Sequence, residues 1–179
     1  LLGTRAEGAS AWRRWGTAAR QAALLAAIPL PIITLNALRV RNCDYFEGLL
    51  FYLLLPGLTV VIASGWGVLV GRVTRRRRLL FWGLLLGSIG LSLARFWLDP
   101  PVDAFNPFLG YYPGSIYDEV VPIGERLLWS RAEDLAWAVA AVGCAGLARG
   151  RAAIVAALGV ALAIGVRIGA IAHDVHRDA

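Results

Sequence analysis

Residues 48–71, GLLFYLLLPGLTVVIASGWGVLVG, run for 24 positions without a charged side chain. An α-helix needs about 20 mainly apolar residues to cross the hydrocarbon core of a bilayer. This stretch therefore predicts a transmembrane helix. Pro56 lies inside it, and because proline removes a backbone donor within a helix, we expect the helix to be disturbed there.

Four further apolar runs of similar character flank this one, at about 18–38, 79–98, 132–148 and 152–172. Hydrophobic residues make up 58% of the 179 positions, against about 45–50% in soluble domains. The sequence thus predicts an all-α membrane protein, a compact antiparallel bundle of about five transmembrane helices that forms a single domain over 1–179. The run 132–148 is short and works as a span only if its helix begins earlier, near Ile123.

Small residues recur at steps of four along the last run: Ala153, Ala157, Ala161, Gly165 and Gly169. Apolar surface does not drive helices together in lipid, so small side chains that permit close backbone approach mark the contacts between helices. We expect this stripe to pack against the helix of the run 132–148.

The charges predict how the helices are oriented. All 18 basic residues are arginine, and eleven of them lie in the N-terminal tail and in two of the turns between runs, with Glu7 as the one acid on that side. The opposite connections and helix ends hold seven arginines and eleven acids. Because cytoplasmic loops carry the positive excess, we expect a cytoplasmic N-terminus and an extracytoplasmic C-terminus. The arginine-, alanine- and glycine-rich composition is typical of a GC-rich bacterial genome, which points to the bacterial inner membrane.

The arginine run at 75–78 lies between two predicted helices and is interpreted as a determinant of topology, so no nucleic-acid partner is expected. The sequence contains no Gly-rich phosphate loop, no HExxH and no GxSxG, so no catalytic residue and no cofactor are predicted. His173 and His176 lie three residues apart without a second ligand motif, which is too little to predict a metal site.

The long connection 99–131 contains FNPFLGYYPGSIYDE, residues 105–119. Its aromatic content argues against disorder, and Asn106-Pro107 and Pro113-Gly114 are typical of turns. We expect an ordered extracytoplasmic cap at the level of the lipid headgroups. Its rings would form either an interfacial aromatic belt or a docking surface. The candidate docking residues are Phe105, Phe108, Tyr111, Tyr112, Tyr117 and Asp118.

Charged residues gather at the predicted outer ends of the runs. The candidate cluster comprises Arg95, Arg167, Glu133, Asp134 and Asp44. These groups either pair structurally and extend to the interface or form a functional site, because ionisable groups in membrane helices are rare and often functional. A proton or substrate pathway requires an acid deep within a span, and the predicted runs contain none, which argues against a pump or channel.

Two stretches resemble a known group of proteins. Residues 35–57, LNALRVRNCDYFEGLLFYLLLPG, together with the aromatic stretch 105–119, are similar to the N-terminal multi-span region of certain bacterial, notably myxobacterial-type, membrane proteins. In that group an extracytoplasmic gluzincin-like peptidase domain follows the spans. The resemblance extends over about 36–177. It implies that the chain is a segment of a longer protein, and it assigns no catalytic residue, because the peptidase motif is absent from these residues.

Two functions are consistent with the sequence. The first is a polytopic membrane anchor that positions or regulates an extracytoplasmic domain or protein partner through its outer aromatic loop. The second is a small transporter or lipid-handling protein that binds its substrate beneath the loop 99–131, beside Arg95 and Arg167. The lipid bilayer is the expected partner in both cases.

Overall fold

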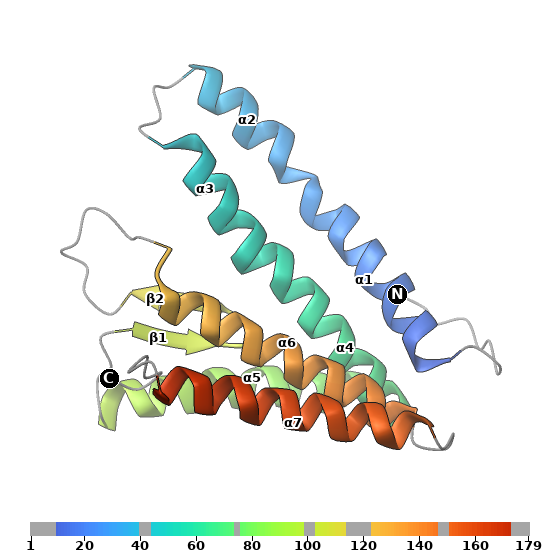
Figure 1. Cartoon of the computed structure of the whole chain (residues 1–179). Coiled ribbons are helices and arrows are strands. Elements are labelled where there is room, and N and C mark those ends of the chain that lie inside the picture. Colours follow the sequence, from blue (N-terminus) through green and yellow to red (C-terminus); the bar gives the residue numbers. More distant parts are fainter. Residues whose placement is uncertain are drawn as a thin grey trace.

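The computed structural model describes residues 10–39, 44–73, 76–98, 103–113, 123–146 and 151–172 of the chain. Most of these residues are helical, which confirms the prediction of a helical protein (Figure 1). The elements in chain order are α1 (Ala11–Ala27), α2 (Pro29–Arg39), α3 (Tyr45–Tyr52), the π-helix η1 (Leu53–Gly57), α4 (Leu58–Val73), α5 (Arg77–Leu98), β1 (Asp103–Asn106), β2 (Gly110–Pro113), α6 (Glu125–Ala145) and α7 (Arg151–Ala172).

Three helical stretches are long and apolar enough to cross a membrane: Ala11–Arg39, Tyr45–Val73 and Arg77–Leu98. They correspond to the first three apolar runs of the sequence. The first begins seven residues before its apolar run because Ser10 caps it, accepting a hydrogen bond from the amide of Arg13 at 3.3 Å. A cap satisfies an amide that has no partner within the first turn, so the helix continues into polar sequence.

The second of these helices changes its hydrogen-bonding pattern around Pro56, within η1. Proline lacks an amide hydrogen, and its ring clashes with the carbonyl four residues earlier, which here belongs to Tyr52. A π-helical turn is wider than an α-helical one and accommodates the ring. The hydroxyl of Tyr52 donates to the carbonyl of Ala26 at 2.6 Å, which ties this turn to α1.

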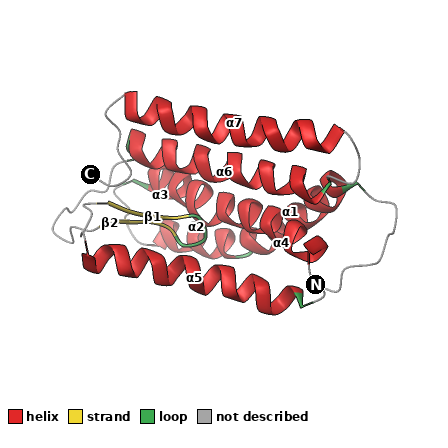
Figure 2. Ribbon diagram, turned by 90° about the horizontal axis from the view of Figure 1, so that it is seen from below, coloured by secondary structure: helices red, strands yellow, loops and turns green. Residues whose placement is uncertain are grey.

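Helix α6 lies at the centre of the bundle, where it packs against α7, α4 and α1 (Figure 2). Small residues make these contacts close. A Cβ on Gly159 of α7 would lie 2.7 Å from the main-chain nitrogen of Ala140, and one on Gly65 of α4 would lie 3.2 Å from the Cβ of Ala138. Glycine is therefore required where α7 and α4 approach α6.

The face of α7 that packs against α6 differs from the predicted stripe. Gly159 and Ala163 are buried, whereas Ala157, Ala161 and Gly165 are exposed. A step of four residues advances about 40° around an α-helix, so a series of such steps winds away from a single contact line. The predicted pairing of the last two helices is confirmed. Gly169 of the predicted stripe takes part, since a Cβ on it would lie 3.0 Å from the indole of Trp129 in α6, whereas Gly159 and Ala163 lie outside that stripe.

Helix α6 begins at Glu125, seven residues before the run 132–148, so residues 125–131 are helical rather than part of the predicted loop 99–131. Leu127, Ser130 and Arg131 within this turn are buried. Neighbouring helices cover these residues, and a helix surrounded by protein does not need an apolar exterior. The start at Glu125 is close to Ile123, where the run 132–148 requires its helix to begin in order to form a span.

Several polar side chains lie inside the molecule beside its apolar core, while many large apolar side chains are exposed. The buried polar and charged residues are Asn106, Ser130, Arg131, Glu133 and Asp134. Helices α1, α2 and α5 have no buried residue, and they expose side chains such as Leu38 and Trp97. Apolar surface exposed to water costs about 25 cal/mol per Å², so this distribution suits lipid.

The strands β1 and β2 pair antiparallel, with Asn106 opposite Gly110 next to the turn. The hairpin lies between α5 and α6 at one end of the bundle (Figure 2). Gly110 has φ +91°, and a Cβ on it would lie 3.0 Å from the Cδ2 of Leu55 in η1. Glycine is needed here because the backbone is left-handed and because the strand approaches η1 closely.

Candidate functional site at the centre of the bundle

The most deeply buried charged group of the described residues is Arg131 of α6, which is 1% exposed. Its Nη2 lies 2.8 Å from the Oδ2 of Asp134, one turn further along the same helix. Nη2 also donates to the main-chain carbonyl of Asn106 at 2.8 Å, and Nη1 donates to the hydroxyl of Thr59 in α4 at 3.3 Å. A guanidinium can be buried only when such partners compensate the loss of water.

Asn106, at the tip of the hairpin, joins this network to α5. Its Nδ2 donates to the hydroxyl of Ser92 at 2.9 Å and to the carbonyl of Ser88 at 3.2 Å. Its Oδ1 accepts from the amides of Phe108 and Leu109 at 2.9 and 3.0 Å. Asparagine side chains commonly bond to amides that follow them and so hold a turn. One residue therefore shapes the tip of the hairpin and attaches it to two helices.

The network lies well inside the helices that contribute to it. Arg131 is 6 residues after the start of α6 and Ser92 is 6 before the end of α5, while the other members lie further in. Thr59 is 14 residues from each end of the helical stretch Tyr45–Val73. Ser88 is 11 residues after the start of α5 and 10 before its end, and Asp134 is 9 residues after the start of α6 and 11 before its end. With a rise of 1.5 Å per residue, Ser88 lies about 15 Å from the end of α5 at Leu98.

This depth corrects two expectations. Asp134 lies at the middle of α6 rather than at an outer mouth, so an acid is present deep in the bundle. The tip of the hairpin reaches the middle of α5, so residues 105–110 form no cap above the helix ends. Both differences arise because protein groups, rather than water at the interface, satisfy the polar atoms of these segments.

Glu133 faces α7, on the side of α6 opposite the network. Its Oε2 lies 3.7 Å from the Nη1 of Arg167, and its Oε1 accepts from the indole of Trp137 at 3.4 Å. The side chain of Arg167 is 50% exposed, so solvent or headgroups can screen this ion pair. The structure thus brings together Glu133 and Arg167 of the predicted cluster, while Asp134 joins Arg131 instead.

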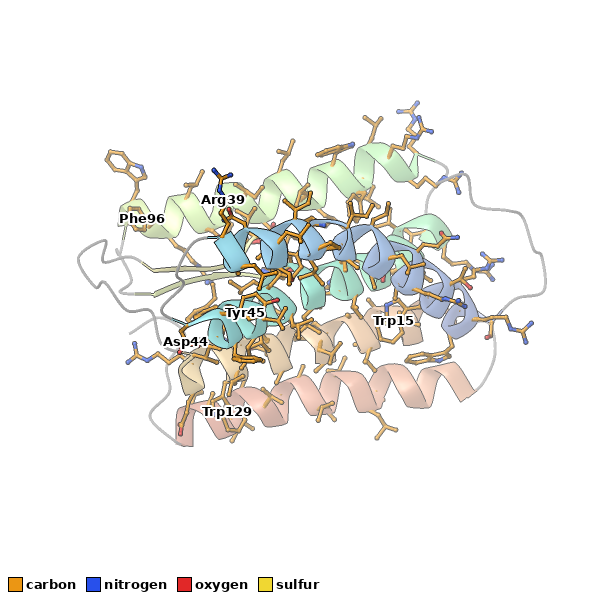
Figure 3. All side chains as sticks on the ribbon, turned by 90° about the horizontal axis from the view of Figure 1, so that it is seen from above. Trp15, Arg39, Asp44, Tyr45, Phe96 and Trp129 are labelled. Carbon is orange, nitrogen blue, oxygen red and sulfur yellow. The ribbon has the colours of Figure 1, made fainter. Side chains whose placement is uncertain are left out.

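The other two members of the predicted cluster lie elsewhere. Asp44 is exposed and caps α3, accepting a hydrogen bond from the amide of Glu47 at 3.1 Å. Arg95 is exposed in the last turn of α5. In Figure 3, Asp44, Phe96 of α5 and Trp129 of α6 all lie toward the same end of the bundle, and Trp15 lies toward the other.

Of the predicted docking residues, only Phe105 and Phe108 have side chains that the structure describes, and both lie partly within the bundle. Phe105 and Phe108 are half-buried, and the ring of Phe108 lies 6.3 Å from that of Phe81 in α5. Tyr111 and Tyr112 belong to β2. Tyr117 and Asp118 lie outside the described residues, as do His173 and His176.

Sequence reasoning missed the residues that form the network: Arg131, Asn106, Thr59, Ser88 and Ser92. Arg131 was counted only as a charge of the outer side. One signal was present, because Ser88 and Ser92 are four residues apart and therefore share a face of an otherwise apolar helix. Ser130, beside Arg131, is also buried, and its hydroxyl has no hydrogen-bond partner among the described residues.

Comparison with protein-family models, curated proteins and solved structures gives no significant match. The resemblance to membrane proteins with a gluzincin-like domain therefore stays a prediction. The function has to be argued from the chemistry of the site.

Proposed function

We propose that this chain is a membrane-embedded binding and transport domain whose substrate binds at Arg131, beside the hairpin 103–113. One observation carries the proposal. A buried ion pair of α6 and a segment of non-helical backbone meet beside α4 and α5, which belong to two of the stretches that are apolar enough to cross a membrane.

In this proposal α6 and α7 cross the bilayer together with the three long apolar stretches, and the N-terminus is cytoplasmic. The apolar exterior of α1, α2 and α5 and the arginine-rich inner turns support this arrangement. Because the network lies inside these helices, Arg131 and Asp134 would then lie about 9 and 14 Å along α6 from its start, within the bilayer. The bilayer in question is proposed to be a bacterial inner membrane.

Charged groups at that depth are costly, and where they occur they usually belong to substrate or ion pathways. Non-helical backbone at membrane depth is tolerated only when protein buries it or when it lines a cavity, as in selectivity filters and the broken helices of transporters. A purely structural bundle needs neither feature, because apolar residues of similar volume would pack at least as well as a buried ion pair.

The same geometry weakens support for the anchor function. An anchor that docks through its aromatic loop should present the rings outward, but Phe105 and Phe108 are half-buried against the bundle. The sequence-based argument against transport was the lack of a deep acid, and Asp134 at mid-helix removes it.

The experiment is a ligand screen by thermal unfolding of the purified protein. The panel contains amino acids, dicarboxylates, organic phosphates and short-chain phospholipids. A ligand that binds only the folded state raises the free energy of unfolding, and the increase grows with the logarithm of the ligand concentration divided by Kd. At a concentration of a hundred times Kd the increase is about 2.7 kcal/mol. We expect at least one class to raise the unfolding temperature, and we expect that ligand to be taken up into proteoliposomes.

Two variants make the screen specific. The double substitution R131M/D134L removes both charges while keeping the volume, and it should abolish the shift. The matched control R77Q removes one arginine from an exposed position at the start of α5 and should keep the shift. A ligand that stabilises the double variant as much as the wild type does not bind at Arg131. If no class distinguishes the two proteins, the anchor function is the better account.

A further inference from the structure

We infer that the tip of the hairpin is a removable plug that occupies the ligand site, and that the ligand it excludes carries a carboxylate or carbonyl oxygen next to an N–H donor, as an amino acid or a short peptide does. The plug is defined as residues 105–110. This inference rests on the proposed function. It names the class of substrate that would bind at Arg131 and the segment that would have to move to admit it.

The ligand class follows from what the plug presents to the helices. Towards α6, Asn106 offers an acceptor, its main-chain carbonyl, to the Nη2 of Arg131 at 2.8 Å. Towards α5, it offers a donor, its Nδ2, to the hydroxyl of Ser92 and the carbonyl of Ser88. When the plug leaves, the guanidinium loses one acceptor and the hydroxyl of Ser92 loses its N–H donor, while the carbonyl of Ser88 keeps its partner within the helix. Buried polar groups left without partners are costly.

A ligand that replaces Asn106 must therefore supply an oxygen for the guanidinium and an N–H for Ser92, within the reach of a single residue. Arginine pairs more strongly with a carboxylate than with a neutral carbonyl, because the hydrogen bond is then between charged groups. A free amino acid or peptide terminus satisfies both requirements. The plug itself is a peptide and so resembles the ligand that it excludes.

The attachment of the hairpin is consistent with movement. Among the described residues its sheet consists of β1 and β2 alone, so withdrawal leaves that pairing intact. A two-stranded hairpin is marginally stable by itself and depends on packing against its neighbours. Its packing contacts include Phe108 with Phe81 and Gly110 with Leu55 of η1. The hairpin packs on the π-helix η1, and π-helical turns occur frequently at functional sites, which supports a functional role for this contact.

The test measures whether water reaches the site. The probe is S88C in a background in which Cys43 and Cys144 are replaced by alanine, in proteoliposomes treated with a membrane-impermeant maleimide. The hydroxyl of Ser88 donates to the carbonyl of Leu85 in its own helix, while its main-chain carbonyl is the group that Asn106 contacts. The substitution therefore leaves the contact with the plug in place.

Two changes shift the plug in opposite directions. N106A removes the side-chain bonds to α5 and should speed the labelling of S88C about tenfold, which corresponds to the loss of one or two hydrogen bonds. The pair L55C/G110C should slow it once oxidised, because a Cβ on Gly110 would lie 3.6 Å from that of Leu55, within the range of a disulfide. A side chain at φ +91° is strained, so the oxidised pair is compared with the same pair in its reduced form. Reductant should restore the rate. The matched control L109A truncates an exposed side chain of the same turn and should leave the rate unchanged.

The ligand class is tested in the N106A background with an equimolar amino-acid mixture at millimolar concentration. Protection of S88C by the mixture, but not by acetate or by methylamine, supports a ligand with both groups. Equal labelling rates in the wild type, N106A and the oxidised pair would show that the plug does not move and would overturn the inference, even if the thermal screen still identified a ligand. Movement without protection by any amino acid would overturn the ligand class.

Discussion

Removing the guanidinium of Arg131 should destabilise the protein far more than removing the ion pair as a whole. R131A takes away the group that contacts Asp134, Asn106 and Thr59. Asp134 is 3% exposed, so its carboxylate remains buried after its cation has gone. The double variant R131M/D134L removes both charges and fills most of the space that they occupied.

The magnitudes follow from these contacts. Breaking a buried pair by removing one partner costs about 3–5 kcal/mol, because an uncompensated charge stays inside. Replacing the whole pair by apolar side chains is often neutral or stabilising by about 1–4 kcal/mol. Here Asn106 and Thr59 also lose a donor, at about 1 kcal/mol each, which offsets much of that gain. We therefore expect R131A to be destabilised by at least about 3 kcal/mol more than the double variant.

The free energy of unfolding can be measured by titrating the protein in mixed micelles with sodium dodecyl sulfate. The intrinsic fluorescence of the seven tryptophans reports the transition. Trp129 and Trp137 of α6 flank Arg131 and are well placed to respond when α6 separates from its neighbours. Equal destabilisation of R131A and R131M/D134L would refute the reasoning, because the loss would then come from packing volume rather than from a buried charge.

Three further predictions concern the helices and their orientation. G159A should lower the stability by about 1–3 kcal/mol, because its Cβ would meet the backbone of α6. G165A has open space around it and should be neutral or slightly stabilising. Unfolding titrations that rank the two variants the other way would contradict the close contact between Gly159 and α6. R167Q should change the stability by less than about 0.5 kcal/mol in the same titration, because its ion pair is long and half-exposed. In intact cells an impermeant maleimide should label S115C but not T74C, and the reverse pattern would invert the proposed orientation.

The sequence predicted the apolar helices well because their signal is local. A stretch without charges, such as 48–71, has to be buried in lipid or protein wherever it lies, so its length and composition suffice to identify it. The structure extends that stretch to Tyr45–Val73. The turn at Asn106-Pro107 was also predictable, since both residue types favour turns.

Hydropathy alone does not locate the start of α6, although the length that a span requires predicts a start near Ile123, close to the observed Glu125. Residues 125–131 include Glu125 and Arg131, and a hydropathy pattern assigns such residues to a loop. Other parts of the chain cover Leu127, Ser130 and Arg131 within this segment, while Glu125 is exposed, and that cover is a property of the packed molecule. The same reasoning explains Asp134, which stands at the beginning of an apolar run but at the middle of a helix.

The candidate site was decided by tertiary structure alone. Asn106 meets Ser92 across 14 residues of sequence and Arg131 across 25, while Arg131 meets Thr59 across 72. Each of these residues taken singly is typical of a turn, a helix surface or a charged helix end.

The sequence by itself determined that the chain forms apolar helices, because hydropathy acts on each residue regardless of its neighbours. Only the tertiary structure decided that a hairpin enters the bundle and that Arg131 is buried against it. A buried guanidinium is tolerated only where its partners converge in space, and the order of residues along the chain does not specify that convergence.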